Sequence, residues 1–225
     1  MIPIRDDNPT HRMPFVAYGI MGLCILVYVW QLALGRQGFH SLFFSLGLIP
    51  AVVTGQAALP EQLALVPPWL TVFTSMFLHG GFFHLAGNLL YLWIFADNVE
   101  DVLGHARFTI FYLLCGIGAA GAQVLPSPDS VIPMVGASGA ISGVLAAYLL
   151  MFPHARVLVA IPLGFILHMI KLRAVTVLGF WFLLQLLSSL MTSPDTGGVA
   201  FRAHLGGFVA GLLLLPLFTG RRRAG

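Results

Sequence analysis

Charged side chains are scarce in this sequence. Aspartate, glutamate, lysine and arginine make up 8% of its 225 residues, whereas hydrophobic residues make up 58%. A soluble globular domain carries about 25% charged residues, so a chain solvated by water alone is excluded. The net charge of +3 comes from basic residues spread between apolar stretches. This distribution does not indicate a nucleic-acid-binding surface, which would gather its cations in one patch.

Cysteine is almost absent as well. Only Cys24 and Cys115 occur, and each lies inside an apolar stretch. A disulfide framework is therefore not expected, and thiol catalysis would need a polar neighbourhood that neither residue has. We interpret both cysteines as packing or lipid-facing residues.

Long apolar stretches are what the sequence has instead. The first, Phe15 to Leu34, has about the 20 residues that a transmembrane helix needs, and it lacks the small-residue cleavage site of a signal peptide. The sequence predicts an all-α membrane protein with a six-helix domain over residues 15–219, between an N-terminal tail (1–14) and a basic C-terminal tail (220–225). The predicted transmembrane helices are residues 15–34, 79–96, 107–125, 136–152, 174–191 and 203–219.

Two further apolar stretches, residues 42–53 and 157–170, are too short to cross a membrane. Each is interrupted by a glycine and a proline. We predict that both form interfacial or re-entrant loops.

The basic residues predict the orientation, because cytoplasmic loops are enriched in lysine and arginine. With six spans and a cytoplasmic N-terminus, only Arg36 and Arg202 of the eleven basic residues lie outside. Both termini are therefore predicted in the cytoplasm, whereas a seventh span would place the three C-terminal arginines outside. The predicted cytoplasmic set is Arg5, Arg12, Arg107, Arg156, Lys171, Arg173, Arg221, Arg222 and Arg223.

Three predicted helices carry polar residues near their outer ends. In the second helix, His84, Asn88 and Tyr91 follow i, i+4, i+7 spacing and share one face. Ser138 lies at the start of the fourth helix and His204 at the start of the sixth. Polar residues inside a membrane are costly and usually face the interior of the bundle, so we predict that these residues meet at one depth.

Small residues recur at every fourth position on the fourth and sixth predicted helices, a pattern that lets helix backbones approach closely in a membrane. We therefore expect these two helices to pack closely, with Ser138 within hydrogen-bond reach of His204. The two rows are Gly139, Gly143 and Ala147, and Ala203, Gly207 and Gly211.

This arrangement predicts serine-protease chemistry. A serine hydroxyl becomes a nucleophile when a neutral histidine accepts its proton, which gives these roles to Ser138 and His204. The Ser138 N–H, at a helix start, would donate a hydrogen bond to the developing oxyanion. The side chains of His84 and Asn88 would donate two more.

Glycines rather than acids flank the predicted nucleophile. Gly136 and Gly139 would let the backbone approach a scissile carbonyl closely. The nearest acids along the second helix, Asp97, Glu100 and Asp101, lie at its opposite end. We therefore predict a Ser–His dyad without a third catalytic acid.

Other interpretations apply to single residues. His84, Asn88 or Gln185 alone is commonly an interhelical hydrogen-bonding group. A zinc site is disfavoured because His79 and His84, five residues apart, lie on different helix faces, and no His-Glu-x-x-His stretch occurs. A transporter is disfavoured because the predicted helices show neither an embedded carboxylate nor an internal repeat.

Taken in order, these motifs resemble those of bacterial-type rhomboid intramembrane serine proteases along nearly the whole chain. The family's Gly-x-Ser-Gly matches residues 136–139, and its Ala-His-x-x-Gly-x-x-x-Gly matches residues 203–211. The resemblance assigns the nucleophile to Ser138 and the base to His204. It assigns the oxyanion hole to His84, Asn88 and the Ser138 N–H, and gives His79 and Glu100 structural roles.

The resemblance also implies a function and a setting. It implies a six-helix core with a water-filled cavity open to the outer side, in a bacterial plasma membrane, and single-span membrane proteins as substrates, cut in or near their transmembrane segment. No cofactor or metal is expected. The alternative is a non-catalytic relative that binds client helices.

Two positions depart from the family pattern. Trp69 is followed by Leu70 rather than arginine, and Ser142 stands where some members place an aromatic residue against the catalytic histidine. The second departure leaves the orientation of His204 to other groups.

Overall fold

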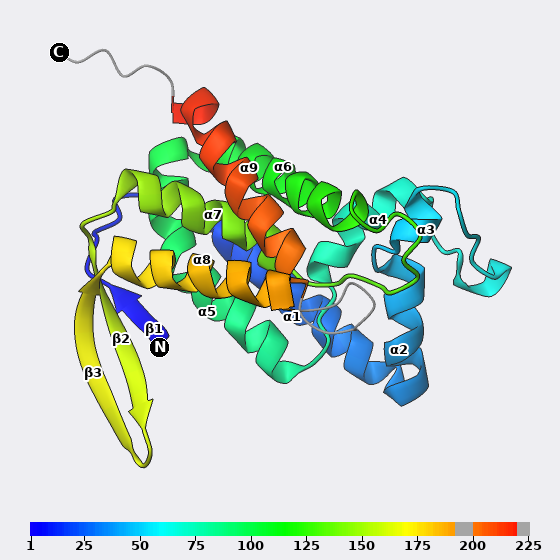
Figure 1. The fold of residues 1–225 in the computed structure, drawn as a ribbon, viewed down its shortest axis with the longest axis horizontal. Coiled ribbons are helices and arrows are strands. Elements are labelled where there is room, and N and C mark those ends of the chain that lie inside the picture. Colours follow the sequence, from blue (N-terminus) through cyan, green and yellow to red (C-terminus); the bar gives the residue numbers. More distant parts are fainter. Residues whose placement is uncertain (192–199, 220–225) are drawn as a thin grey trace.

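The computed structural model describes residues 1–191 and 200–219. It is a bundle of helices with a small antiparallel sheet at one end (Figure 1). One helix occupies each of the six stretches that the sequence predicts as transmembrane helices. They are α1 (Phe15–Ala33), α5 (Phe82–Leu103), α6 (His105–Val124), α7 (Ser138–Met151), α8 (Ala174–Met191) and α9 (Phe201–Thr219).

Not all of these helices have the length and composition of a membrane span. Four of them, α1, α6, α8 and α9, are each long and apolar enough to cross a membrane. Helix α5 meets that criterion together with the preceding segment Glu61–Phe77, which is bent away from it by 80°. Helix α7 has only 14 residues. The described residues thus form a mostly helical protein with four or five candidate spans, and the count of six stays a prediction.

Helix α5 is shifted relative to the predicted span 79–96. It begins at Phe82, so His79 lies before the helix rather than in it. It ends at Leu103, seven residues later than predicted, where Gly104 adopts φ +75° and turns the chain directly into α6. A positive φ of this size is readily adopted only by glycine, which explains the sharp turn.

The chain between α1 and α5 is folded into short helices. Residues 42–53, predicted as a loop, instead complete α2 and form α3. Gly47 adopts an extended conformation after the first helix, and Pro50 begins the second, a position that suits its fixed φ. These elements are α2 (Gly35–Leu46), α3 (Pro50–Val53), α4 (Thr71–Thr74) and the 3₁₀ turns η1 (Glu61–Leu63), η2 (Pro68–Leu70) and η3 (Ser75–Phe77).

Residues 156–173 form a β-hairpin rather than a re-entrant loop, whereas the predicted interfacial position of residues 157–170 stays a prediction. Strands β2 (Arg156–Leu163) and β3 (Ile166–Arg173) pair antiparallel, and Gly164 lies in the turn with φ +61°. Strand β1 (Ile2–Asp6), from the predicted N-terminal tail, pairs with β2 and gives the sheet order β1-β2-β3. The addition of β1 could not be predicted locally, because it joins segments that are far apart in the sequence.

Polar contacts attach the sheet to the helices. The Tyr148 hydroxyl of α7 donates a hydrogen bond to the Asp6 carboxylate, and the Arg156 N–H donates to Asp7 at 2.9 Å. Burial raises the pKa of Asp6, because desolvation disfavours the charged carboxylate. The N-terminal segment is therefore an integral part of the fold.

Glu100 stabilises the start of α1 from a neighbouring helix. Its carboxylate accepts hydrogen bonds from the N–H groups of Val16 and Ala17 at 2.9 and 2.8 Å, and its Oε1 lies 2.6 Å from Nδ1 of His105. The first N–H groups of a helix have no intrahelical acceptor, and the positive end of the helix dipole favours an anion there. Glu100 thus has a structural contact, at the end of α5 away from Ser138.

Helix α7 lies at the centre of the bundle. Every residue from Gly139 to Tyr148 is buried, and α5, α6, α8 and α9 pack around it (Figure 1). Helices that surround a short helix shield its backbone and side chains from lipid. The small residues on α7 leave room for these neighbours.

The predicted close contact between α7 and α9 is present. A Cβ atom at Gly207 would lie 1.8 Å from the carbonyl oxygen of Gly139, and one at Gly211 would lie 2.4 Å from that of Gly143. Neither position has space for a side chain, so the two backbones touch at two successive turns. This contact fixes the distance between the starts of α7 and α9.

We predict that Gly207→Ala lowers the free energy of unfolding by about 1–3 kcal/mol, because the added methyl forces the two backbones apart. The measurement is the midpoint of thermal unfolding in detergent. The matched control is Gly179→Ala on α8, where a Cβ would meet nothing within 4 Å. An equal effect of the two substitutions would contradict the proposed role of the α7–α9 contact.

Candidate active site

Ser138 is the first residue of α7, and the loop before it is shaped by a glycine. Gly136 has φ +120° and donates its N–H to the Ser75 carbonyl at 2.8 Å. A Cβ there would lie 2.6 Å from Nε2 of His84, so only glycine fits both the backbone and the space. The Ser138 N–H lacks an intrahelical acceptor and is not capped by a side chain.

Ser138 and His204 form a hydrogen bond across the α7–α9 contact. The Ser138 Oγ lies 2.7 Å from Nε2 of His204, and the imidazole is 8% exposed. The two residues are 66 positions apart in the sequence. The structure therefore brings together the two side chains that the sequence predicts as a dyad.

A third residue, Gln185 of α8, holds the other ring nitrogen. Its Oε1 lies 2.6 Å from Nδ1 of His204. A carboxamide oxygen only accepts hydrogen bonds, so Nδ1 carries the proton of the neutral ring and Nε2 presents its lone pair to the Ser138 hydroxyl. Gln185 thus sets the tautomer that a general base requires. The sequence indicated Gln185 only as an interhelical hydrogen-bonding group.

Aromatic side chains pack near the same ring. The Trp181 ring of α8 lies 6.0 Å from the His204 ring, centroid to centroid, and the Phe201 ring lies at 6.4 Å in an edge-on arrangement. Ser142, in the position that departs from the family pattern, instead donates its hydroxyl to the Ser138 carbonyl at 2.6 Å. The orientation of His204 therefore comes from α8 and not from the turn after Ser138.

His84 and Asn88 of α5 face the Gly136–Ser138 segment. The Gly80 N–H donates to Nδ1 of His84 at 3.2 Å, so the neutral ring carries its proton on Nε2, the atom close to Gly136. The Asn88 side chain is 6% exposed, and among the described residues its Nδ2 has no hydrogen-bond partner. A buried N–H without a partner is costly, and here it provides a free donor beside the serine.

A cavity of about 680 Å³ opens in front of these groups. This size lies in the usual range for ligand pockets. The pocket joins apolar walls to a few polar groups, which suits an extended, mostly apolar peptide segment. Its lining includes Phe83, Tyr91, Trp181 and the four polar residues His84, Asn88, Ser138 and His204.

His79 lies behind the site, with its ring 5.2 Å from the His84 ring, centroid to centroid. His79 is fully buried, and Gln31 exchanges two hydrogen bonds with its backbone, at 3.0 and 3.2 Å. Within residues 1–191 and 200–219, no three histidine, cysteine or acidic side chains are grouped to hold a metal. The hydrogen bonds of the His204 ring in this part of the chain go to Gln185 and Ser138.

The chain matches a known family over most of its length. Residues 67–221 match the model of the rhomboid domain. YdcA, a rhomboid-family protein of Bacillus subtilis, is 32% identical over 183 residues, which cover 80% of this chain and 83% of YdcA.

Other relatives come from plants and bacteria. RHOMBOID-like protein 5 of Arabidopsis thaliana is 27% identical over 183 residues, 80% of this chain and 55% of that protein. The rhomboid protease GluP of Bacillus subtilis is 43% identical over 81 residues, 36% of this chain and 15% of GluP. The chain thus spans most of YdcA but about half of the Arabidopsis protein.

We predict that Gln185→Leu slows the reaction of Ser138 with a fluorophosphonate by about 10–100-fold, the effect of losing one hydrogen bond to a group that gains charge. Gln185→Glu retains an acceptor oxygen and is expected to keep more activity than the leucine variant. The control is Leu184→Ala, at the neighbouring exposed position. Equal loss in the Glu and Leu variants would indicate a packing role for Gln185 only.

Proposed function

The chain belongs to the rhomboid family. We propose that it is an intramembrane serine endopeptidase. Its substrates are single-span membrane proteins, cut in or near their transmembrane segment. The observation that supports this best is the 2.7 Å contact between Ser138 Oγ and His204 Nε2, with His204 Nδ1 held by Gln185. A serine and a histidine in packing roles alone would not need this tautomer.

In the proposed reaction, the Ser138 oxygen attacks the scissile carbonyl carbon while Nε2 of His204 takes the hydroxyl proton. The carbonyl oxygen becomes an oxyanion. The Ser138 N–H, the Nε2–H of His84 and the free Nδ2–H of Asn88 donate hydrogen bonds to it. The His204 imidazolium keeps its Nδ1–H on Gln185 throughout.

The intermediate then collapses to an acyl-enzyme. The C–N bond breaks, and His204 returns its proton to the leaving amine. Water entering the cavity gives a proton to His204 and attacks the ester carbonyl carbon. The C–O bond to Ser138 then breaks, His204 returns the proton to the Ser138 oxygen, and the carboxylic acid product leaves. No cofactor or metal takes part in the proposed sequence.

The proposed topology has six spans with both termini in the cytoplasm. The site then opens to the outer side, near the ends of α5, α7 and α9 where His84, Ser138 and His204 lie. The bias of lysine and arginine supports this orientation, and a bacterial plasma membrane is the proposed location. The proposed partners are the lipid bilayer and transmembrane protein substrates. Binding to nucleic acid is not proposed.

A second candidate function is binding of client membrane proteins without cleavage. The 680 Å³ cavity would serve such binding as well. The free donors beside Ser138 favour the protease, because a binding site for apolar helices has no use for an unpaired Asn88 amide.

The proposed activity is tested with purified protein and a labelled transmembrane substrate. We expect Ser138→Ala and His204→Ala to lower cleavage at least about 1,000-fold, since neither partner of the dyad works alone. The matched control is Ser142→Ala, one turn along the same helix, where the hydroxyl only contacts its own helix. Persistent cleavage by Ser138→Ala would rule out the mechanism, and binding without cleavage by the wild type would favour the client-binding alternative.

A further inference from the structure

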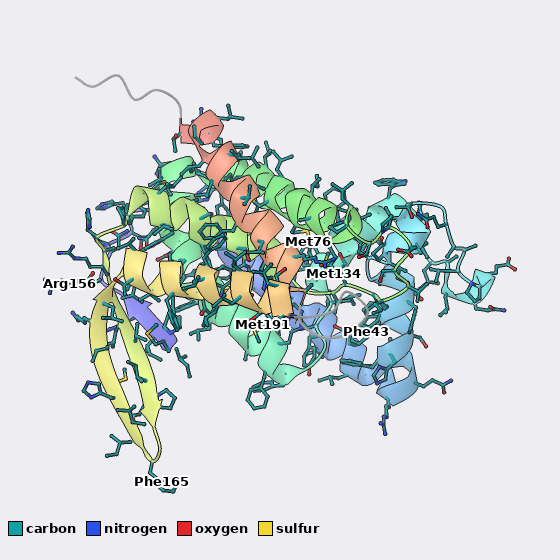
Figure 2. All side chains as sticks on the ribbon, in the orientation of Figure 1. Phe43, Met76, Met134, Arg156, Phe165 and Met191 are labelled. Atoms are coloured by element: carbon teal, nitrogen blue, oxygen red, sulfur yellow. The ribbon has the colours of Figure 1, made fainter. Side chains whose placement is uncertain are left out.

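The β2–β3 hairpin extends from the helical bundle, with β1 paired along the base half of β2. Its strands have eight residues each, which corresponds to a reach of about 26 Å. Its base lies at the ends of α7 and α8, and its tip stands clear of the helices (Figure 1). Figure 2 shows Arg156 at the base and Phe165 at the tip.

One face of the hairpin is apolar except for His168. Residues paired directly across the two strands share a face, and on this face the pairs are Val157 with Leu172, Val159 with Ile170, Ile161 with His168 and Leu163 with Ile166. Val157 and Val159 are fully buried in the hydrophobic core. The same face continues outward, where Ile166 is 70% exposed. Protein covers this face only at the base.

On the opposite face, the basic residues lie at the base of the hairpin and the apolar residues lie towards its tip. At the base it pairs Arg156 with Arg173, and Leu158 with Lys171, and Arg5 of β1 lies beside Leu158. Towards the tip the pairs are Ala160 with Met169 and Pro162 with Leu167. Residues 161–169, which we call the hairpin tip, are apolar on both faces except for His168.

We propose that the hairpin tip lies in the headgroup region of the bilayer, in the leaflet beside the base of α8. Arg156, Lys171 and Arg173 then lie at the level of anionic lipid phosphates. Apolar side chains next to cations are the surface that the interface of an anionic membrane attracts. In the proposed topology this leaflet is the cytoplasmic one.

The connection to α8 fixes the position of the hairpin base along the membrane normal. Arg173 ends β3, and Ala174 begins α8, a candidate membrane span. The base of the hairpin therefore lies where a span leaves the bilayer. The free edge of β3 also limits the depth, since unpaired backbone groups are not tolerated in the hydrocarbon core.

A lipid surface fits the tip better than a peptide strand does. A strand added to β3 would pair with its edge and leave both apolar faces of the tip in water. Phe165 is fully exposed in the turn beyond the last residue pair, where an added strand has no partner. The bilayer interface would cover the edge, both faces and Phe165 together.

Lipid contact at the tip would anchor one end of α8. The buried residues of α8 are Ala174, Val177 and Leu178, all in its first turns next to the hairpin. Gln185 and Trp181, which hold His204, lie further along the same helix. The anchor thus acts on the helix that positions the proposed base.

The test places a nitroxide label at Phe165→Cys in nanodiscs that contain phosphatidylcholine and phosphatidylglycerol. Native Cys24 and Cys115 are fully buried, so the label reports on the tip. The control label is at Thr10→Cys, an exposed position in the segment between β1 and α1. We expect the ratio of collision rates with oxygen and with a water-soluble nickel chelate to be severalfold higher at the tip. Adding Lys171→Gln and Arg173→Gln should lower that ratio.

Three results would overturn the proposal. Nickel access at the tip equal to that at Thr10→Cys would mean that the tip lies in water. Protection of the label from both oxygen and the nickel chelate, in detergent as well as in nanodiscs, would mean that a second copy of the chain covers the tip. Protection that appears only after a transmembrane substrate is added would mean that a peptide covers it. None of these readouts depends on proteolysis, so a failure of the proposed lipid contact can be distinguished from a failure of the proposed protease function.

Discussion

The contact between the backbones of α7 and α9 is the constraint on which the site depends. Gly139 and Gly143 meet Gly207 and Gly211 with no room for a side chain. Lipid supplies no hydrophobic force between helices, so such close packing is what holds them. Because Ser138 and His204 lie at the starts of these two helices, the same contact sets the 2.7 Å distance between their reacting atoms.

Gln185, a neutral hydrogen-bond acceptor, holds the ring of His204 in the site. A carboxylate at position 185 would place a charge in a candidate membrane span, where ionised side chains are costly. Gln185 fixes the ring tautomer without that cost. It also ties the histidine to α8, a helix that is buried mainly in its first turns. The position of α8 and the orientation of the base are therefore linked.

Spacing within one helix predicted that His84 and Asn88 share a face, and a common depth at three helix starts predicted that Ser138 and His204 lie beside them, as the lining of the cavity shows. Their catalytic roles stay predictions. Gln185 was not recognised as a partner of His204, since its contact depends on how α8 packs against α9. The β-hairpin was missed because its strands are as apolar as a membrane-embedded loop, and the pairing of β2 with β1 depends on a segment from the other end of the chain. The bend before α5 and the shortness of α7 also left the number of spans open.

Labelling with a fluorophosphonate tests the central claim most directly, because this reagent forms a covalent bond only with an activated serine oxygen. The purified protein would be treated in detergent, digested and analysed by mass spectrometry. We expect one adduct, on the peptide that contains Ser138, and a much slower reaction in His204→Ala. No adduct at Ser138, or equal labelling with and without His204, would contradict it.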